Sequence, residues 1–184
     1  PFQPSRFASL RATTPVPVSW ETIVNELTGP FHKAQTELYR QTIARLHQAE
    51  QDNDNLLLPK LKAEKEQIKQ AQPAFIASVS LTGGRTSAHI TGYSGVIMVD
   101  IDDIPPGQFA ETLARIKADP HTFLAHTTIS GVGIRVFVRM ENAVTKHDFL
   151  LAWKTVNEYY VHLSGIGYDF KCKNPTRMSV ICHD

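Results

Sequence analysis

The sequence is poor in cysteine and has no long hydrophobic run. Its 184 residues include two cysteines, Cys172 and Cys182, which are too few for the disulfide framework of a small secreted domain. No apolar stretch approaches the roughly 20 residues that cross a bilayer. No basic segment followed by an apolar one opens the chain, as a secretion signal would. We therefore expect two reduced thiols in a cytoplasmic protein that does not enter a membrane.

The chain also lacks a strong charge of either sign. It has 19 Lys and Arg against 18 Asp and Glu, a net charge of +1, which neither requires nor excludes nucleic acid. Binding to a polyanion would need a local basic patch. Hydrophobic residues make up 42% and charged residues 20% of the chain, proportions that argue against global disorder. We expect one folded domain with an N-terminal extension, in a native protein that continues past Asp184.

Proline, glycine and the hydrophobic pattern divide the chain into three regions. Residues 1–18, rich in Pro, Ser, Thr and Arg, are expected to be a poorly ordered, flexible lead-in. Residues 19–73 are expected to form a helical extension packed on the core, with Ser19 as its first N-cap. Residues 74–184 are expected to form an α+β core. The helices predicted in the extension span residues 20–27, 33–50 and about 59–70.

The core region mixes strand-like and helix-like patterns. Strands are expected at 75–81, 95–101, 123–130, 134–140 and 178–182, and helices at 109–117 and 146–164. The two strands that flank the turn at Ser130 are almost contiguous, which predicts an antiparallel hairpin. Strands and helices do not alternate strictly. This order favours an α+β fold with a mostly antiparallel sheet layered with helices.

The strongest chemical signal is the Asp-x-Asp that ends an apolar strand, at Asp100 and Asp102. Side chains two apart on a strand point to the same face, so these carboxylates are expected side by side. Two such carboxylates repel unless one takes up a proton. A Mg²⁺ or Mn²⁺ ion removes the conflict, and these ions prefer oxygen ligands. The alternative is a strand end that carries two solvated acids.

A second signal is the glycine-rich turn that contains Ser130, Gly131 and Gly133 and leads to Arg135. Glycines let a ligand approach the backbone, and successive N–H groups in such a turn bind anions. Arg135 could pair with phosphate oxygens through its two-pronged guanidinium. Taken alone, the segment fits a plain hairpin turn with an exposed arginine better.

A third signal is an acid followed by basic residues, Asp169 with Lys171, Lys173 and Arg177. Asp169 could complete a metal site, and the cations could meet the phosphates of a nucleotide or template. A solvated run of loop charges is the more frequent explanation of such a cluster.

Taken together and in this order, the signals resemble the archaeo-eukaryotic primase superfamily, and more closely the VirE N-terminal-domain family of bacterial mobile-element proteins. The matching segments are SGVIMVDIDDI, TISGVGIRVFVRM and YDFKCKNPTRMSVICHD. The charged helix before Pro73 and the segment FIASVSLTGGR also look similar, so that the resemblance covers roughly residues 33–184. It implies an RRM-like primase catalytic core with metal-dependent nucleotidyl transfer.

The resemblance also assigns roles by position. The matching residues are Asp100, Asp102 and Asp169 for Mg²⁺ or Mn²⁺, Ser130 and Arg135 for nucleotide phosphates, and Arg177 as a terminal basic residue. Many primases have histidine in place of Arg135. Arginine binds phosphate but cannot act as a neutral imidazole, so this departure bears on activity more than on fold. The family often places an ATPase, helicase-like module after this domain, which is the expected downstream partner.

Two functions from different classes remain open. The first is a primase-polymerase that uses a nucleoside triphosphate and a single-stranded DNA template in the replication of a mobile element. The second is a non-catalytic module that binds single-stranded DNA or nucleotide through Lys171, Lys173 and Arg177 and still binds in EDTA. A purely structural domain is the least favoured, because it leaves the acid pair unexplained.

Overall fold

The computed structural model describes residues 2–141, 144–168 and 170–184, and at residues 170 and 171 the backbone alone. At its centre is an antiparallel sheet of three strands in the order β6-β8-β7. The strands are β6 (Val96–Ile101), β7 (Thr122–Thr127) and β8 (Ile134–Arg139). The expected hairpin is confirmed, since β7 and β8 pair antiparallel across the turn. All six residues of β6 are buried, in keeping with its run of β-branched side chains.

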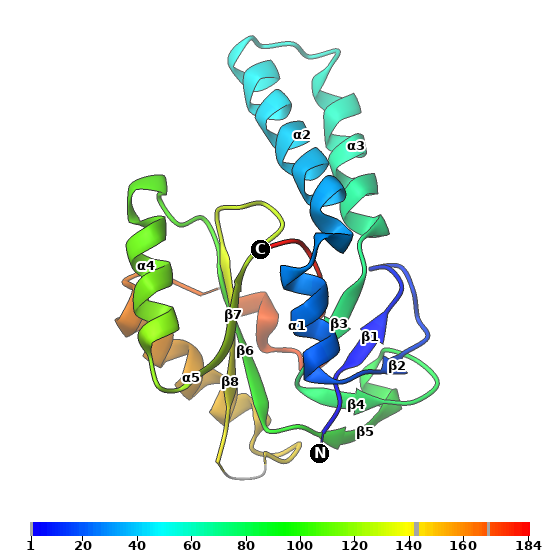
Figure 1. Ribbon diagram of the computed structural model, residues 1–184, viewed down its shortest axis with the longest axis vertical. Coiled ribbons are helices and arrows are strands. Elements are labelled where there is room, and N and C mark those ends of the chain that lie inside the picture. Colours follow the sequence, from blue (N-terminus) through cyan, green and yellow to red (C-terminus); the bar gives the residue numbers. More distant parts are fainter. Residues whose placement is uncertain (1, 142–143, 169) are drawn as a thin grey trace.

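Helices cover both faces of this sheet. In Figure 1, α4 (Pro106–Ala118) and α5 (Phe149–Ser164) lie on one side and α1 (Trp20–Thr28) on the other. The side chain of Ser19 accepts a hydrogen bond from the backbone N–H of Thr22 and so caps α1 as predicted. The α1 residues Ile23 and Leu27 belong to the same hydrophobic core as the sheet. The α+β class with an antiparallel sheet is confirmed.

A second sheet brings in the N-terminal segment. Its order is β2-β1-β3-β9, formed by β1 (Ser5–Phe7), β2 (Val16–Pro17), β3 (Ala74–Ile76) and β9 (Ser179–Val180). The lead-in expected at residues 1–18 therefore includes a strand that pairs with β3 along its whole length. Phe7 explains the difference, because its fully buried side chain packs in an apolar cluster with Ile76 and Val79.

The segment expected as one strand at 75–81 is divided between two sheets. β3 ends at Ile76, and β4 (Val79–Leu81) pairs with β5 (Ile90–Tyr93), a strand that the sequence pattern did not predict. The chain changes sheets at Ala77 and Ser78. A short helical turn, η2 (Ser87–His89), precedes β5, and another, η3 (Phe170–Lys173), follows α5.

Two long helices project from the body as a hairpin (Figure 1). They are α2 (Lys33–Gln51), which follows the short turn η1 (Pro30–His32), and α3 (Leu58–Ala71), and they pack on each other. The last turn of α3 returns to the body and brings Lys69 next to the sheet. None of the helices in the described part of the chain combines the length and the hydropathy that a bilayer crossing requires.

Candidate functional site

The predicted acid Asp100 and the predicted phosphate ligand Arg135 lie opposite each other on β6 and β8. The Arg135 guanidinium holds both oxygens of the Asp100 carboxylate, with Nε–Oδ1 at 2.9 Å and Nη2–Oδ2 at 2.5 Å. The pair is buried, with side-chain exposures of 1% for Asp100 and 12% for Arg135. Burial lowers the pKa of Arg135, but the Asp100 carboxylate raises it, and the net direction is upward. The guanidinium is therefore charged, and the two groups form a buried ion pair.

Two further contacts fix this pair. The Cys172 thiol donates a hydrogen bond to Asp100 Oδ2 at 3.3 Å, and Arg135 Nη1 donates to the Met178 carbonyl at 3.2 Å. Burial, and then the Asp100 charge, raises the pKa of Cys172 to about 12. Both cysteines are buried thiols. A neutral thiol at this position is a hydrogen-bond donor to Asp100 and not a nucleophile.

Asp102 lies just past the end of β6 and, unlike Asp100, is exposed. Its carboxylate lies against the glycine-rich turn, so that a Cβ added at Gly133 would come within 2.7 Å of Asp102 Oδ1. The glycine is thus required by the close approach of the acid and the backbone. Asp100 and Asp102 line one cavity of about 110 Å³ together with Ser130.

The turn itself is closed by its own hydrogen bonds. The Gly131 N–H donates to the Thr128 carbonyl at 2.9 Å, and the Thr128 N–H donates to the Gly133 carbonyl at 2.8 Å. Gly131 has a φ of +81°, a conformation that favours glycine. Because its N–H is already bonded, Gly131 does not offer a donor to an anion. From this turn, Thr128, Ile129 and Ser130 line the cavity.

The third signal is only partly within the described residues. Arg177 lines the cavity, on a turn in which its N–H donates to the Asn174 carbonyl at 2.9 Å. Asp169 and the side chain of Lys171 lie outside the described residues. Their assigned roles therefore stay predictions.

The structure adds cavity residues that the sequence pattern did not reveal. His126 on β7 is opposite Arg135 in the strand register, so Asp100, Arg135 and His126 form a row across the three strands. Burial, and then the charge of Arg135, lowers the pKa of His126 to about 4. Its Nδ1–H donates to the Thr127 carbonyl, and its Nε2 accepts from the Ser179 hydroxyl at 3.3 Å. The sequence pattern could not show this row, because it depends on the registers of both strand pairs.

A larger groove of about 620 Å³ adjoins the cavity. The two share Lys69, Arg135 and Arg177. Arg85 also lines the groove, held in place by its bonds to the carbonyls of Leu10 and Ala12. Among the described residues that line it there are four cations and no Asp or Glu. We call this the basic groove and the space at Asp100 and Asp102 the acidic cavity.

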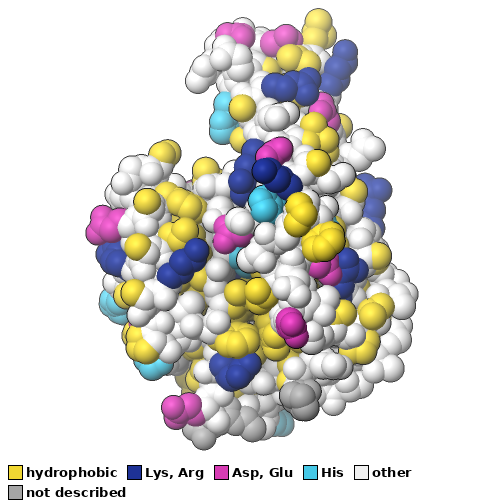
Figure 2. All heavy atoms as spheres, in the orientation of Figure 1, with side chains coloured by type: hydrophobic (Ala, Val, Ile, Leu, Met, Phe, Trp, Pro, Cys, Tyr) yellow, Lys and Arg dark blue, Asp and Glu magenta, His cyan; other side chains and the backbone are white. Residues whose placement is uncertain are grey.

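The charge of the rest of the surface is mixed. On the face shown in Figure 2, cationic, acidic and hydrophobic side chains are interspersed over the body and the hairpin. This agrees with the net charge of +1. The basic groove is the kind of local patch that a polyanion would need.

The donors of the acidic cavity fit a divalent ion in part. Carboxylate oxygens suit Mg²⁺ or Mn²⁺, but both oxygens of Asp100 are bonded to Arg135. Within residues 2–141, 144–168 and 170–184, no three His, Cys, Asp or Glu side chains come together as ligands. An ion at Asp100 would compete with Arg135 for the carboxylate oxygens.

Residues 67–184 match the family described as BT4734-like, N-terminal domain. The chain belongs to this family. The match begins within α3 and includes every residue that lines the acidic cavity except Tyr39. The narrower VirE description is not confirmed. No curated protein matches the sequence.

Two solved structures are similar to this BT4734-like domain at a low level. One is the primase-polymerase domain of cyanophage S-2L, with 18% identity and a TM-score of 0.41, covering 60% of this chain and 55% of that one. The other is the polymerase domain of ligase D from Mycobacterium tuberculosis in complex with DNA, with 12% identity and a TM-score of 0.41, covering 64% and 49%. The chain thus spans about half the length of each. Likeness of this degree decides neither the fold nor the function.

Proposed function

We propose that this BT4734-like domain binds a nucleoside triphosphate and transfers its nucleotide to the 3′ end of a nucleic acid, in the manner of a primase-polymerase. The observation that carries the proposal is the meeting of three distant segments at one cavity. Asp100 and Asp102 come from the end of β6, Ser130 from the turn before β8, and Arg177 from the segment before β9. The cavity adjoins a groove lined by four cations, as a triphosphate beside carboxylates requires.

Each residue then has a distinct task. Asp100, Asp102 and Asp169 would hold Mg²⁺ or Mn²⁺, which supplies positive charge to the phosphate oxygens. The Ser130 hydroxyl donates a hydrogen bond to one of these oxygens. Catalysis of this kind consists mainly of positioning and charge neutralisation and needs no strong protein base.

The cations of the basic groove act on the triphosphate. Lys69, Arg177 and the predicted ligand Lys171 neutralise its negative charge. The 3′ hydroxyl oxygen bonds to the α-phosphorus, its proton passes to solvent, and the bond to the β,γ-pyrophosphate breaks. Charge on the departing pyrophosphate increases as that bond breaks, so cations near it stabilise the transition state more than the ground state.

Arg135 connects the two parts of the site. Its guanidinium neutralises Asp100 but also lines the basic groove. A phosphate in the groove competes with Asp100 for this guanidinium. We therefore also propose that nucleotide binding draws Arg135 toward the phosphate, which leaves the Asp100 carboxylate available to a cation.

The setting follows from the resemblance. We extend the proposal to the replication of a mobile element, with single-stranded DNA as template and a downstream ATPase or helicase-like module as partner. Binding of a template strand in the basic groove would be sensitive to salt, because phosphate contacts release counterions.

A second candidate is metal-independent binding of single-stranded DNA without catalysis. The bidentate ion pair between Asp100 and Arg135 favours it, since a guanidinium already occupies the place that a metal ion would take. In that case Asp100 serves to hold Arg135, and the basic groove alone carries the function.

The two candidates are separated by Asp102→Asn, with Asp103→Asn as a matched control. Both residues are exposed. Asp103 has a φ of +55°, which asparagine also adopts readily. Titration of Mn²⁺ with dATP, followed by a primer-extension assay, should show binding and incorporation in the wild type and in Asp103→Asn. Asp102→Asn should lose at least about tenfold in both, as expected for the loss of a metal ligand.

Other outcomes would change the conclusion. If single-stranded DNA binds equally well in EDTA to all three proteins and no nucleotide is incorporated, the second candidate holds. If neither dATP nor DNA binds to the wild type, both candidates are wrong.

A further inference from the structure

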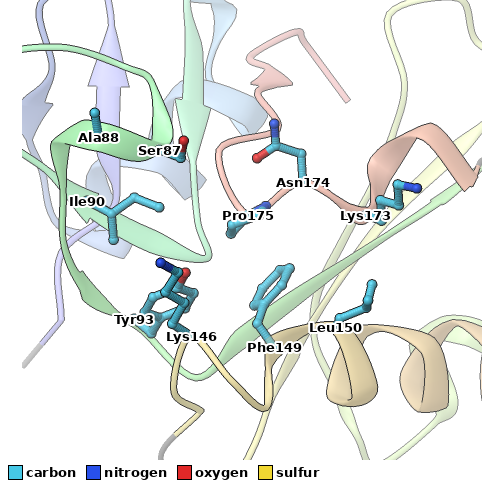
Figure 3. Close-up of a pocket in the computed structure, with 10 residues that line it drawn as sticks. All are labelled: Ser87, Ala88, Ile90, Tyr93, Lys146, Phe149, Leu150, Lys173, Asn174 and Pro175. Atoms are coloured by element: carbon cyan, nitrogen blue, oxygen red, sulfur yellow. The ribbon is translucent and has the colours of Figure 1, made fainter.

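A second pocket, of about 800 Å³, adjoins the basic groove. Figure 3 shows residues of three parts of the chain around a common space. They are Ser87, Ala88, Ile90 and Tyr93 from η2 and β5, Lys146, Phe149 and Leu150 at the start of α5, and Lys173, Asn174 and Pro175 from the end of η3 and the loop after it. We call this the apolar pocket. Of the residues in the sequence signals, Lys173 lines it.

The wall of the apolar pocket is aromatic and aliphatic. The rings of Tyr93 and Phe149 lie 5.8 Å apart at an angle of 51°. Phe149 is almost fully buried and supports Tyr93, which is partly exposed. Leu150 is 57% exposed although it is a large apolar side chain at the first turn of a helix. An exposed apolar wall of this kind favours an apolar or aromatic ligand.

The pocket and the basic groove are continuous in their lining, since Ser87 and Asn174 belong to both. Lys146 and Lys173 line the pocket, and its described lining residues include no Asp or Glu. An aromatic wall next to a path of cations complements a ligand that carries an aromatic ring and a chain of phosphates.

We propose that the apolar pocket holds an unstacked base of a single-stranded nucleic acid whose phosphates lie in the basic groove. Stacking on a side chain such as Tyr93 is how single-strand-binding sites accept bases without reading their sequence. Asn174, at the junction of pocket and groove, supplies an amide that can bond to the sugar or to the base edge.

Size favours a strand over a free nucleotide. The groove and the pocket have volumes of about 620 and 800 Å³, and each alone has the size of a site for one small ligand. A single nucleotide would leave one of the two unfilled. The inference rests on the proposed function in one respect, namely that the basic groove takes phosphates.

The test compares two strands and two matched variants. The strands are a labelled oligothymidylate of about 12 nucleotides, within the usual site sizes, and the same backbone with abasic sugars. The variants are Ala88→Trp, which fills the pocket from its exposed rim, and Ala114→Trp, which places the same ring on the exposed side of α4. Affinities are measured by fluorescence anisotropy in EDTA, so that metal binding at the acidic cavity does not contribute.

The wild type should bind the thymidylate strand about fivefold or more tightly than the abasic strand, the effect of at least one stacked base. Ala88→Trp should remove this preference and leave the abasic affinity unchanged, whereas Ala114→Trp should change neither. Leu150→Asn, at an exposed position, should also reduce the preference for the thymidylate strand. This variant provides the test if Ala88→Trp does not fold.

Three results would overturn the inference. Equal binding of both strands by the wild type means that the apolar pocket holds no base, but it leaves the assignment of phosphates to the basic groove unaffected. If Ala88→Trp weakens the competition of free dTTP with the labelled strand but leaves the affinity for the strand itself unchanged, the occupant of the apolar pocket is a mononucleotide. Absence of binding by either strand overturns the inference and the assignment of the basic groove together.

Discussion

Replacement of Arg135 by methionine would leave Asp100 as a buried charge without its partner. Asp100 is 1% exposed, and of the hydrogen bonds that the structure describes at its carboxylate, Arg135 donates two and the Cys172 thiol one. A neutral thiol cannot balance the charge. Breaking a buried ion pair by removal of one partner destabilises proteins by about 3–5 kcal/mol. We expect a loss of that size in the free energy of unfolding for Arg135→Met.

The loss should be much smaller when both partners are replaced. In Asp100→Leu/Arg135→Met no unpaired charge is left at this buried position of the sheet, and burial of apolar groups offsets the missing pair. Such replacements are often close to neutral. The double variant should therefore recover most of the stability that Arg135→Met loses. If stability is recovered in the double variant, the loss in Arg135→Met comes from the unpaired charge of Asp100 and not from a general loss of packing at β8.

Urea unfolding followed by tryptophan fluorescence gives these values directly. A surface pair serves as the control: Arg45 and Glu64 are 3.2 Å apart with side-chain exposures of 54% and 38%, so Arg45→Met should cost less than about 1 kcal/mol. If Arg135→Met also costs less than about 1 kcal/mol, the argument from burial is wrong. The same follows if the double variant is as unstable as the single one.

Three further predictions concern the surroundings of the acidic cavity. Burial lowers the pKa of His126 from 6.5 to about 4, so the unfolded chain binds more protons than the folded one between these pH values. The contribution of His126 to the free energy of unfolding should be fully present above pH 6.5 and fall by about 3 kcal/mol as the pH drops to 4. Urea unfolding at each pH should show this loss in the wild type and not in His126→Leu. An added methyl in Gly133→Ala would meet the Ile101 carbonyl at 2.9 Å, and thermal unfolding should show a loss of about 1–3 kcal/mol. Burial raises the pKa values of Cys172 and Cys182 to about 12, so a thiol reagent at pH 8 should label both in urea and neither in the native protein; rapid native labelling would contradict this.

The sequence pattern was most informative where structure is local. Ser19 caps α1 because its side chain needs only a nearby N–H, and the hairpin at Ser130 forms because two strands are joined by a short turn. It failed where pairing is distant. β1 pairs with β3, about 70 residues away in the chain, and no local signal in residues 1–18 specifies that partner.

The candidate site shows the same division. Strand and turn patterns in the sequence identified Asp100, Asp102 and Ser130 as candidate site residues, and these three residues line one cavity. The neighbours of Arg135 depend on register. β6 pairs with β8 and not with β7, which places Arg135 between Asp100 and His126. Lys69 enters the cavity from α3, and its position depends on how the helical hairpin meets the sheet.

This register bears directly on the choice between the two candidate functions. While Arg135 holds Asp100, its guanidinium offsets one of the two carboxylates of the cavity, and Lys69 and Arg177 add positive charge to the same lining, so a divalent ion is not attracted there. A phosphate that draws Arg135 into the basic groove frees the Asp100 carboxylate, brings its own negative charge beside Lys69 and Arg177, and adds its oxygens as ligands. Nucleotide and metal would then each favour the binding of the other by the same factor, as linkage requires. If Arg135 stays on Asp100, no such coupling exists, and the basic groove acts alone as a site for phosphates.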